Sequence, residues 1–190
     1  MSKVLFLAPM HREYVNMKDA LKWSKVDFEY KVVECGVGKA NAAATTAQEC
    51  MDDYDAVILI GYAAASYKYK QGDFVVIGKV RYHDVVVPKG LVPELEQEYA
   101  LDGEDNILLT GDVFVNRDLA LKLQLKYGKM CLFDMEGAAV AQICEWTNQK
   151  LFIAKIVSDI PTDPSSSFQK FVEEHNDFSQ FVSFAKAVVD

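Results

Sequence analysis

Three carboxyl groups follow closely on apolar stretches that predict buried strands. Glu13 comes soon after KVLFLAP, Glu136 follows MCLF almost at once, and Asp159 ends FIAKIVSD. Such groups can share acid and base chemistry, because one with a raised pKa can donate a proton while an ionised one handles water. Ligands of open α/β sheets bind outside the carboxyl ends of the strands. Glu13, Glu136 and Asp159 are therefore candidate functional residues.

Each acid also has a purely structural interpretation. Glu13 could be a first-turn charge favoured by the helix dipole, and Glu136 could be the same with Asp134 as the N-cap. Asp159 could cap the turn into IPTDP. The GVGK segment at 36–39 resembles part of a phosphate loop, but neither GxGxxG nor GxxxxGK[ST] is complete. A Gly-rich turn that leads into a helix is the simpler interpretation of that segment.

The elements that must position these acids alternate between strand and helix. Predicted strands cover residues 3–9, 28–35, 55–61, 106–116, 129–134 and 150–159, with a hairpin or one long bent strand over 72–87. Predicted helices cover 12–24, 117–128 and 165–189, with further helices after Gly38 and after Glu136. This alternation predicts a three-layer α/β/α sandwich with a largely parallel central sheet. The length fits a single domain over residues 1–190.

Composition narrows the function classes. The formal net charge is −8, with 28 acidic and 20 basic residues, which argues against nucleic acid as a partner because phosphate contacts need clustered Lys and Arg. No stretch approaches the roughly 18 apolar residues of a membrane span, and the N-terminal apolar run is too short for a secretory signal. We therefore expect a cytoplasmic protein with no membrane partner. The four cysteines lack CxxC spacing and the three histidines lie far apart, so we expect reduced thiols and no metal site.

The acids together suit cleavage of a sugar–base bond. That bond breaks through an oxocarbenium-like state, so one carboxylic acid must protonate the leaving base while another carboxylate handles the water. Hydrogen bonds to the sugar hydroxyls tighten as positive charge develops. The aromatic Phe114 and the polar Ser158 lie near the same predicted strand ends.

Motifs along nearly the whole chain resemble the nucleoside phosphorylase/nucleosidase superfamily. FDMEGAAVAQIC followed by FIAKIVSDIPTD resembles its signature, and APMHREYV, CGVGKANAA, GDFVVIGKVRYHD and GDVFVN occur in the family's order. The most similar branch is that of the 5′-methylthioadenosine/S-adenosylhomocysteine nucleosidases. The resemblance implies a mixed, largely parallel sheet partly closed into a barrel, a small-molecule nucleoside as partner, no metal or organic cofactor, and a homodimer.

The resemblance also implies a role for each candidate residue. Asp159 is expected to be the general acid that protonates the purine at N7. Glu136 is expected to hydrogen-bond the ribose hydroxyls, with Met135 packed under the sugar. Glu13 is expected to orient or deprotonate the attacking water.

Four more residues are expected at the substrate. By resemblance, Phe114 stacks on the base and Val115 offers it backbone hydrogen bonds, while Ser158 adjoins the acid. Tyr62 stands where the nucleosidases carry a small residue whose backbone approaches the ligand, so it is expected to narrow or reshape the pocket.

Hydrolysis is favoured over phosphorolysis by the first loop. LAPMHREYV lacks the Gly-Asp of phosphorylases, and Glu13 beside Arg12 would repel phosphate. Two departures keep other functions open: the segment between Val87 and Gly111 is short, and Lys155 replaces an arginine that is common in the family, so it cannot make the same bidentate contact. The alternatives are phosphorolysis, a futalosine-type substrate and a non-catalytic nucleoside-binding protein.

Overall fold

The computed structural model describes residues 1–189. The strands are β1 (Lys3–Ala8), β2 (Glu29–Glu34), β3 (Ala56–Leu59), β4 (Tyr62–Ala65), β5 (Phe74–Val76), β6 (Lys79–Tyr82), β7 (Tyr99–Ala100), β8 (Ile107–Thr110), β9 (Cys131–Asp134) and β10 (Leu151–Asp159). The helices are α1 (His11–Trp23), α2 (Lys39–Glu49), α3 (Pro93–Glu96), α4 (Arg117–Tyr127), α5 (Gly137–Trp146), α6 (Phe168–Glu174) and α7 (Ser179–Val189).

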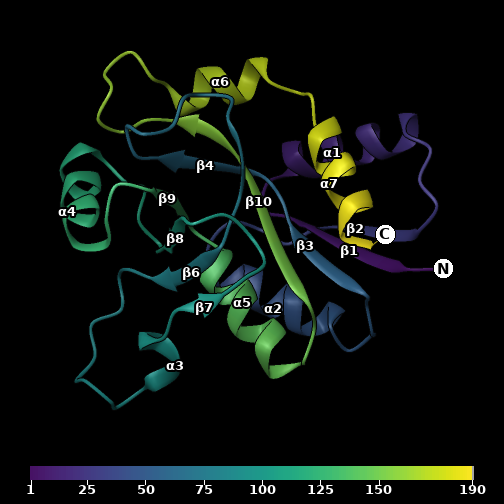
Figure 1. Ribbon diagram of the computed structural model, residues 1–190, viewed down its shortest axis with the longest axis horizontal. Helices are drawn as coiled ribbons and strands as arrows, with labels where there is room; N and C mark the ends of the chain where they lie inside the picture. The colour runs from purple at the N-terminus through teal and green to yellow at the C-terminus, as the bar shows by residue number, and fades with distance from the viewer. Residues whose placement is uncertain (190) are drawn as a thin grey trace.

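Within the described residues the strands form one mixed sheet, in the order β2-β1-β3-β10-β4-β9-β8-β6-β7, with β5 added beside β10. Most neighbours are parallel, and the antiparallel pairs are β4–β9, β5–β10 and β6–β7. Helices α1 and α7 cover one face, and α2 and α5 cover the other (Figure 1). The predicted three-layer α/β/α sandwich with a mixed, largely parallel central sheet is confirmed.

The apolar run of β1 reflects its central place between two helical layers. Phe6 packs in the cluster that holds residues of α1 and α7, whereas Leu5 and Leu7 pack in the cluster that holds residues of α2 and α5. Strands covered on both faces are apolar throughout rather than alternating. Helix α5 packs so closely on β8 that a Cβ on Gly137 would lie 2.6 Å from Leu108 Cδ2, so the absence of a side chain at Gly137 permits this approach.

The sheet divides where β3 meets β4. Both strands pair with β10 in one register, with Leu59 beside Ile153 and Tyr62 beside Ile156. On the opposite edge, β3 pairs with β1 in parallel, but β4 pairs with β9 in antiparallel fashion. The carboxyl ends of β1 and β9 therefore approach this junction from opposite directions, which makes it a topological switch point of the kind that holds ligands in α/β sheets.

Several predicted elements differ in the structure. Residues 72–87 form neither a hairpin nor one bent strand, because β5 pairs with β10 while β6 pairs with β7 and β8. The break falls beside Gly78, where a Cβ would collide with the Glu104 backbone. The predicted strand 106–116 ends at Thr110, and β4 was not predicted.

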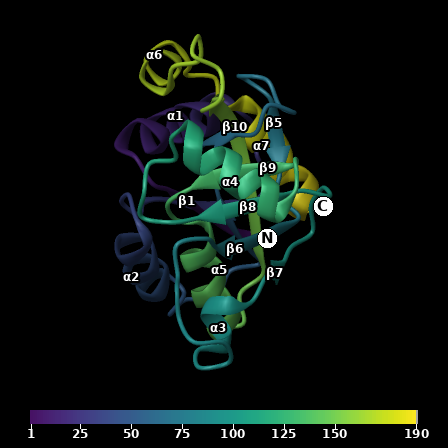
Figure 2. The same cartoon turned by 90° about the vertical axis from the view of Figure 1, so that its left-hand side faces the viewer.

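The predicted C-terminal helix is divided in two. A break over 175–178 separates α6 from α7, and the Asp177 carboxylate accepts a hydrogen bond from Ser179 N–H at 2.9 Å, as a helix cap does. The break turns α6 over the carboxyl end of β10 while α7 packs beside α1 (Figures 1 and 2).

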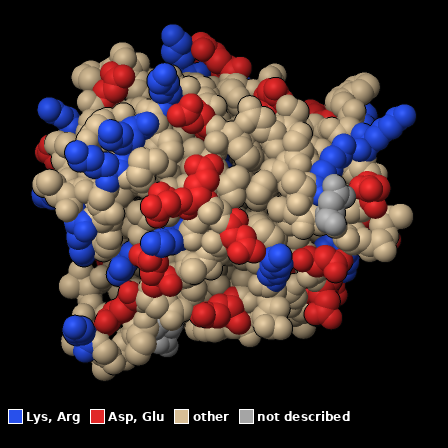
Figure 3. Space-filling view, in the orientation of Figure 1, with Lys and Arg blue, Asp and Glu red and all other residues tan. Residues whose placement is uncertain are grey.

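Charge is unevenly distributed on the surface. On the face in Figure 3, basic side chains gather over α4, and acidic side chains are scattered over the remainder. Along the described chain, no helix is both long and apolar enough to cross a membrane.

Candidate active site

A pocket at the junction of β1, β4 and β9 receives the three predicted acids from three different elements. Glu13 enters from the first turn of α1, Glu136 from the start of α5, and Asp159 from the end of β10. Their exposed fractions are 1%, 5% and 6%, and Asp134 beside them is 8% exposed. The structure thus brings together carboxyl groups that are up to 146 positions apart (159 − 13) in the sequence.

Two backbone N–H groups hold Glu13. Met10 donates to Oε2 at 2.8 Å and Tyr62 donates to Oε1 at 2.7 Å. The close approach requires Gly61, whose φ is +128° and where a Cβ would collide with the carboxylate. Burial raises the pKa of Glu13 to about 7, against the opposing effects of Lys155 and the two N–H groups. Near neutral pH this carboxyl can therefore accept and return a proton.

Glu136 is held by the Gly-rich turn before α2. Gly38 N–H donates to its Oε1 at 2.9 Å. Glu136 stands at the N-cap position of α5, but its side chain makes no capping hydrogen bond. Asp134 Oδ2 instead accepts the hydrogen bond from Gly137 N–H at 2.9 Å. Burial and the charge of Asp134 raise the pKa of Glu136 to about 7. The capping interpretation therefore fits Asp134, and it leaves Glu136 facing the pocket.

Asp159 carries the third carboxyl group of the pocket. Ser158 donates its hydroxyl to Asp159 Oδ1 at 2.7 Å. Burial raises the pKa of Asp159 above its ordinary value, although this hydrogen bond opposes the shift. A carboxyl with a raised pKa keeps its proton to higher pH, as a general acid requires. Ser158 is itself fully buried and acts on the pocket through Asp159.

Lys155 is a fully buried cation among these acids. Its Nζ lies 3.2 Å from Asp134 Oδ2. Burial lowers the pKa of Lys155, but the charges of Asp134, Glu136 and Glu13 outweigh burial and raise it above the ordinary value. Asp134 Oδ1 also accepts the Thr110 hydroxyl at 2.7 Å. The prediction that Asp134 only caps a helix was therefore incomplete, because Asp134 is the ion-pair partner of the buried lysine.

Apolar side chains complete the pocket wall. Phe114 is 63% exposed, and its ring meets Phe168 of α6 edge to face at 5.7 Å between centroids. Val115 and Met135 line the same pocket, as does Met10. Flat apolar walls beside a cluster of carboxyl groups suit a ligand with a planar part and a polar part.

Tyr62 contributes its backbone and its ring to different places. Its N–H holds Glu13, as described above, while its ring packs edge-on against Phe171 and Phe178 at 6.0 and 5.5 Å. Its hydroxyl donates to the His175 carbonyl at 2.9 Å. Tyr62 therefore joins the pocket to the junction of α6 and α7.

Three contributors to the site were missed as functional residues. A lysine inside the apolar run FIAKIV is a signal of a buried cation, because an unpaired charge is not tolerated there. Phe168 could have been suspected from the aromatic density of α6, whereas nothing in the sequence marks Gly38 N–H as a donor to Glu136. Among residues 1–189, no group of His, Cys, Asp and Glu is arranged to hold a metal ion.

The fold and the site define a class of protein. The family model described as the phosphorylase superfamily matches residues 29–190. The chain belongs to the phosphorylase superfamily, and the resemblance found in its motifs is confirmed.

Individual relatives are nucleosidases. The 5′-methylthioadenosine/S-adenosylhomocysteine nucleosidase of Chromohalobacter salexigens is 32% identical over 174 residues, which cover 77% of this chain and 74% of the relative. The Neisseria meningitidis nucleosidase of that name, solved in complex with methylthio-immucillin-A, has a TM-score of 0.83 at 24% identity and covers 98% of this chain and 100% of its own. A mutant futalosine hydrolase of Helicobacter pylori has a TM-score of 0.81 at 20% identity, with 100% and 99% covered.

Proposed function

We propose that the chain hydrolyses the N-glycosidic bond of a purine nucleoside of the methylthioadenosine or adenosylhomocysteine type. The observation that carries the proposal is the convergence of Glu13, Glu136 and Asp159 on one pocket with an apolar wall. The names of the relatives support the same substrate class. A protein that only bound nucleosides would have no need for a buried carboxyl group with a raised pKa, such as that of Asp159.

In the proposed reaction, Asp159 donates its proton to the purine at N7 as the bond to the sugar breaks. The bonding electrons leave with the base, and positive charge develops on the ribose. Glu136 hydrogen-bonds the ribose hydroxyls, and Met135 packs under the ring. Water then attacks the sugar carbon, and Glu13 orients the water and takes its proton.

The remaining predicted residues bind the base and shape the pocket. Phe114 stacks on the purine, Val115 offers it backbone hydrogen bonds, and Ser158 orients the carboxyl of Asp159. Tyr62 supplies the N–H that holds Glu13. No metal or organic cofactor takes part in this scheme.

Hydrolysis rather than phosphorolysis is supported by the charges near the pocket. Arg12 donates to the Glu173 carbonyl, Lys39 is paired with Asp84, and Lys155 is paired with Asp134. Lys39 and Lys155 are thus paired with carboxylates, whereas Arg12 is exposed, does not line the pocket and donates to a neutral carbonyl. The pocket itself carries several carboxyl groups. A phosphate anion entering this pocket would meet repulsion rather than a vacant positive charge.

The test is the release of free base with and without inorganic phosphate. Methylthioadenosine, adenosylhomocysteine, inosine and futalosine are the substrates to compare. Turnover of an adenine nucleoside that is independent of phosphate is the expected result. Turnover only with phosphate would assign the chain to phosphorolysis, and turnover of futalosine alone would change the substrate. Binding without any turnover would favour the non-catalytic alternative.

We also propose that one domain over residues 1–190 acts as a homodimer in the cytoplasm. The exposed apolar side chains of Phe114, Leu121 and Leu125, close to the pocket and on α4, offer a surface for a second copy. Light scattering should give the mass of two chains, and a monomer at micromolar concentration would contradict the dimer.

A further inference from the structure

The position of Glu136 depends on a turn that has little rigidity of its own. Gly38 N–H, which donates to Glu136 Oε1 at 2.9 Å, lies in a turn where both Gly36 and Gly38 have positive φ, +79° and +92°. Glycine has more conformational freedom than any other residue, so the turn depends on contacts that fix it. The Asn41 amide donates to the Val37 carbonyl at 2.8 Å, which ties the turn to its own helix but not to the rest of the site. The next residue, Lys39, provides that connection.

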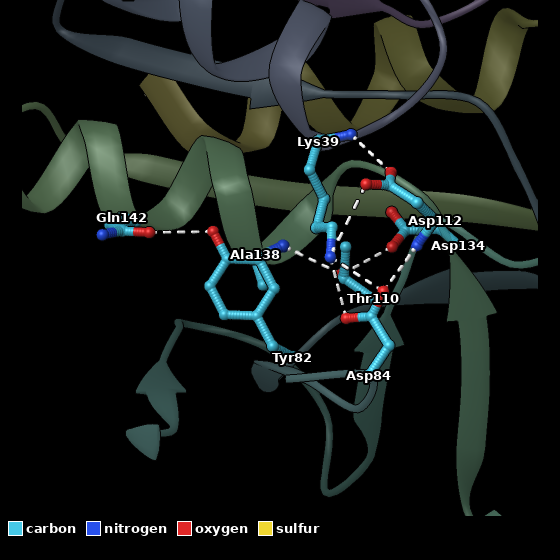
Figure 4. Close-up of polar contacts among 8 residues, drawn as sticks. All are labelled: Lys39, Tyr82, Asp84, Thr110, Asp112, Asp134, Ala138 and Gln142. Atoms are coloured by element: carbon cyan, nitrogen blue, oxygen red, sulfur yellow. Dashed lines mark hydrogen bonds and ion pairs between the residues drawn. The ribbon is translucent and has the colours of Figure 1, made fainter. Parts of the chain in front are cut away.

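Lys39 binds the loops that follow two other strands. Its Nζ donates to both carboxylate oxygens of Asp84, at 2.9 and 2.8 Å, and its own N–H donates to Asp112 Oδ1 at 2.9 Å (Figure 4). Asp112 N–H donates in turn to Asp84 Oδ2 at 2.9 Å. Asp84 follows β6 and Asp112 follows β8, so the three residues close a ring that joins the start of α2 to two strand ends. We call Lys39, Asp84 and Asp112 the Lys39 clamp.

A second set of contacts holds the two residues that flank Glu136, Asp134 and Ala138. Thr110, at the end of β8, donates its hydroxyl to Asp134 and accepts a hydrogen bond from Ala138 N–H at 2.9 Å (Figure 4). β8 therefore holds the start of α5 through Thr110 and the start of α2 through Asp112. The side chain of Glu136, through Gly38 and Lys39, and the residues that flank Glu136 are therefore all connected to β8 or to the loop that follows it.

The clamp is shielded enough to be more than a surface ion pair. The side chains of Lys39 and Asp84 are 23% and 18% exposed, whereas Asp112 is 50% exposed. Although burial raises the pKa of Asp84, the donors Lys39 and Asp112 N–H bring it below its ordinary value. The ion pair between Lys39 and Asp84 also means that Lys39 is not a vacant cation for a phosphate group.

We propose that Lys39 is a positioning residue, which holds Gly38 N–H on Glu136 through the clamp and so sets how tightly the pocket binds the ribose hydroxyls. The inference rests on the proposed function of Glu136 as the ribose ligand. It predicts that loss of the clamp weakens binding of the sugar more than binding of the base, because the Phe114 ring packs on Phe168 and Asp159 is held by Ser158.

The test compares Lys39→Met with the parent protein, both in an Asp159→Asn background that prevents turnover. Dissociation constants are measured by calorimetry for methylthioadenosine and for adenine. Methylthioadenosine should bind about 10- to 100-fold more weakly, which corresponds to the ~1.5–3 kcal/mol of a hydrogen bond to a charged group. Adenine should change by less than about twofold. An unchanged affinity for methylthioadenosine, or equal losses for both ligands, would overturn the proposal.

Two further variants separate the clamp from a general effect on α2. Lys31→Met removes a different ion pair of α2, the one that Glu49 at the end of the helix forms with Lys31 of β2 at 2.6 Å, and should leave both affinities unchanged. Asp84→Asn should weaken the binding of methylthioadenosine as much as Lys39→Met does. The double variant should lose little more affinity than either single variant, since the two residues act as one unit. Additive losses would contradict a shared clamp.

A readout without substrate distinguishes failure of the clamp from failure of the proposed function. The Gly38 amide should exchange its hydrogen with solvent faster in Lys39→Met than in the parent or in Lys31→Met. If the parent binds no nucleoside, the proposed function fails, and this exchange alone decides whether the clamp holds Gly38. Unchanged exchange would overturn the clamp whatever the ligand.

Discussion

The buried lysine offers a demanding test of the electrostatics of the pocket. In a Lys155→Met variant, a side chain of similar length replaces the cation, but Asp134 loses an ion-pair partner at 3.2 Å. Glu13 and Glu136 lose the positive charge that opposes their burial. Removing one partner of a buried ion pair costs about 3–5 kcal/mol of stability, so we expect a loss of that size at about pH 8.

The stability lost in Lys155→Met should be smaller at acid pH, because protonated carboxyl groups no longer need the positive charge. A carboxyl whose pKa is raised on folding contributes stability that is complete below its unfolded pKa and is lost as the pH rises through its folded pKa. For Glu13 these values are 4.5 and about 7. Glu13 alone should therefore lower the wild-type free energy of unfolding by roughly 2 kcal/mol between about pH 5.5 and pH 8. In the variant the carboxyl pKa values rise further, so its stability should fall more steeply over that range.

Urea denaturation followed by circular dichroism at about pH 5.5 and pH 8 measures both effects. The control is Lys79→Met, which removes the exposed ion pair with Glu98 at 3.8 Å and should change stability by less than about 0.5 kcal/mol. A deficit of the Lys155 variant that is equal at both pH values, or as small as that of the control, would refute the buried-cation account.

Further predictions concern the acid and the turn beside Glu13. Asp159→Asn should lower kcat at least about 100-fold while the melting temperature stays near that of the wild type, and near-normal rates would remove Asp159 from the acid role. Gly61→Ala should lower the free energy of unfolding by about 1–3 kcal/mol, because alanine is strained at the positive φ of this position. It should also lower kcat/KM, because the added Cβ collides with the Glu13 carboxylate. Gly72→Ala has a similar φ of +93° but nothing within 4 Å, so it should affect stability alone. Equal kcat/KM in the two glycine variants would contradict the claim that the close contact between Gly61 and the Glu13 carboxylate is needed for activity.

The fold and the three acids could be predicted because their signals are local. Buried parallel strands are continuous apolar runs, and a residue shortly beyond such a run must lie at the ligand edge of the sheet. Glu13, Glu136 and Asp159 satisfied that condition, which is why each could be named as a candidate before any contact was known. Their convergence on one pocket could not be predicted, because it depends on how three separate elements pack.

The remaining features depend on contacts between distant residues. The segment YAAA of β4 has weak strand propensity, and it is extended because β9 and β10 pair with it on both edges. The partner of Lys155 lies on a different strand, and the donor to Glu136 is a backbone N–H, which no side-chain pattern reveals. The division of the C-terminal helix likewise brings Phe168 to the pocket through tertiary packing.

The central claim is that three carboxyl groups from separate elements act on one nucleoside. A crystal structure of Asp159→Asn with methylthioadenosine tests it most directly. The account predicts the purine against Phe114 with N7 facing residue 159, the ribose hydroxyls on Glu136 and a water beside Glu13. A nucleoside bound outside this pocket, or one whose hydroxyls face away from Glu136, would contradict it.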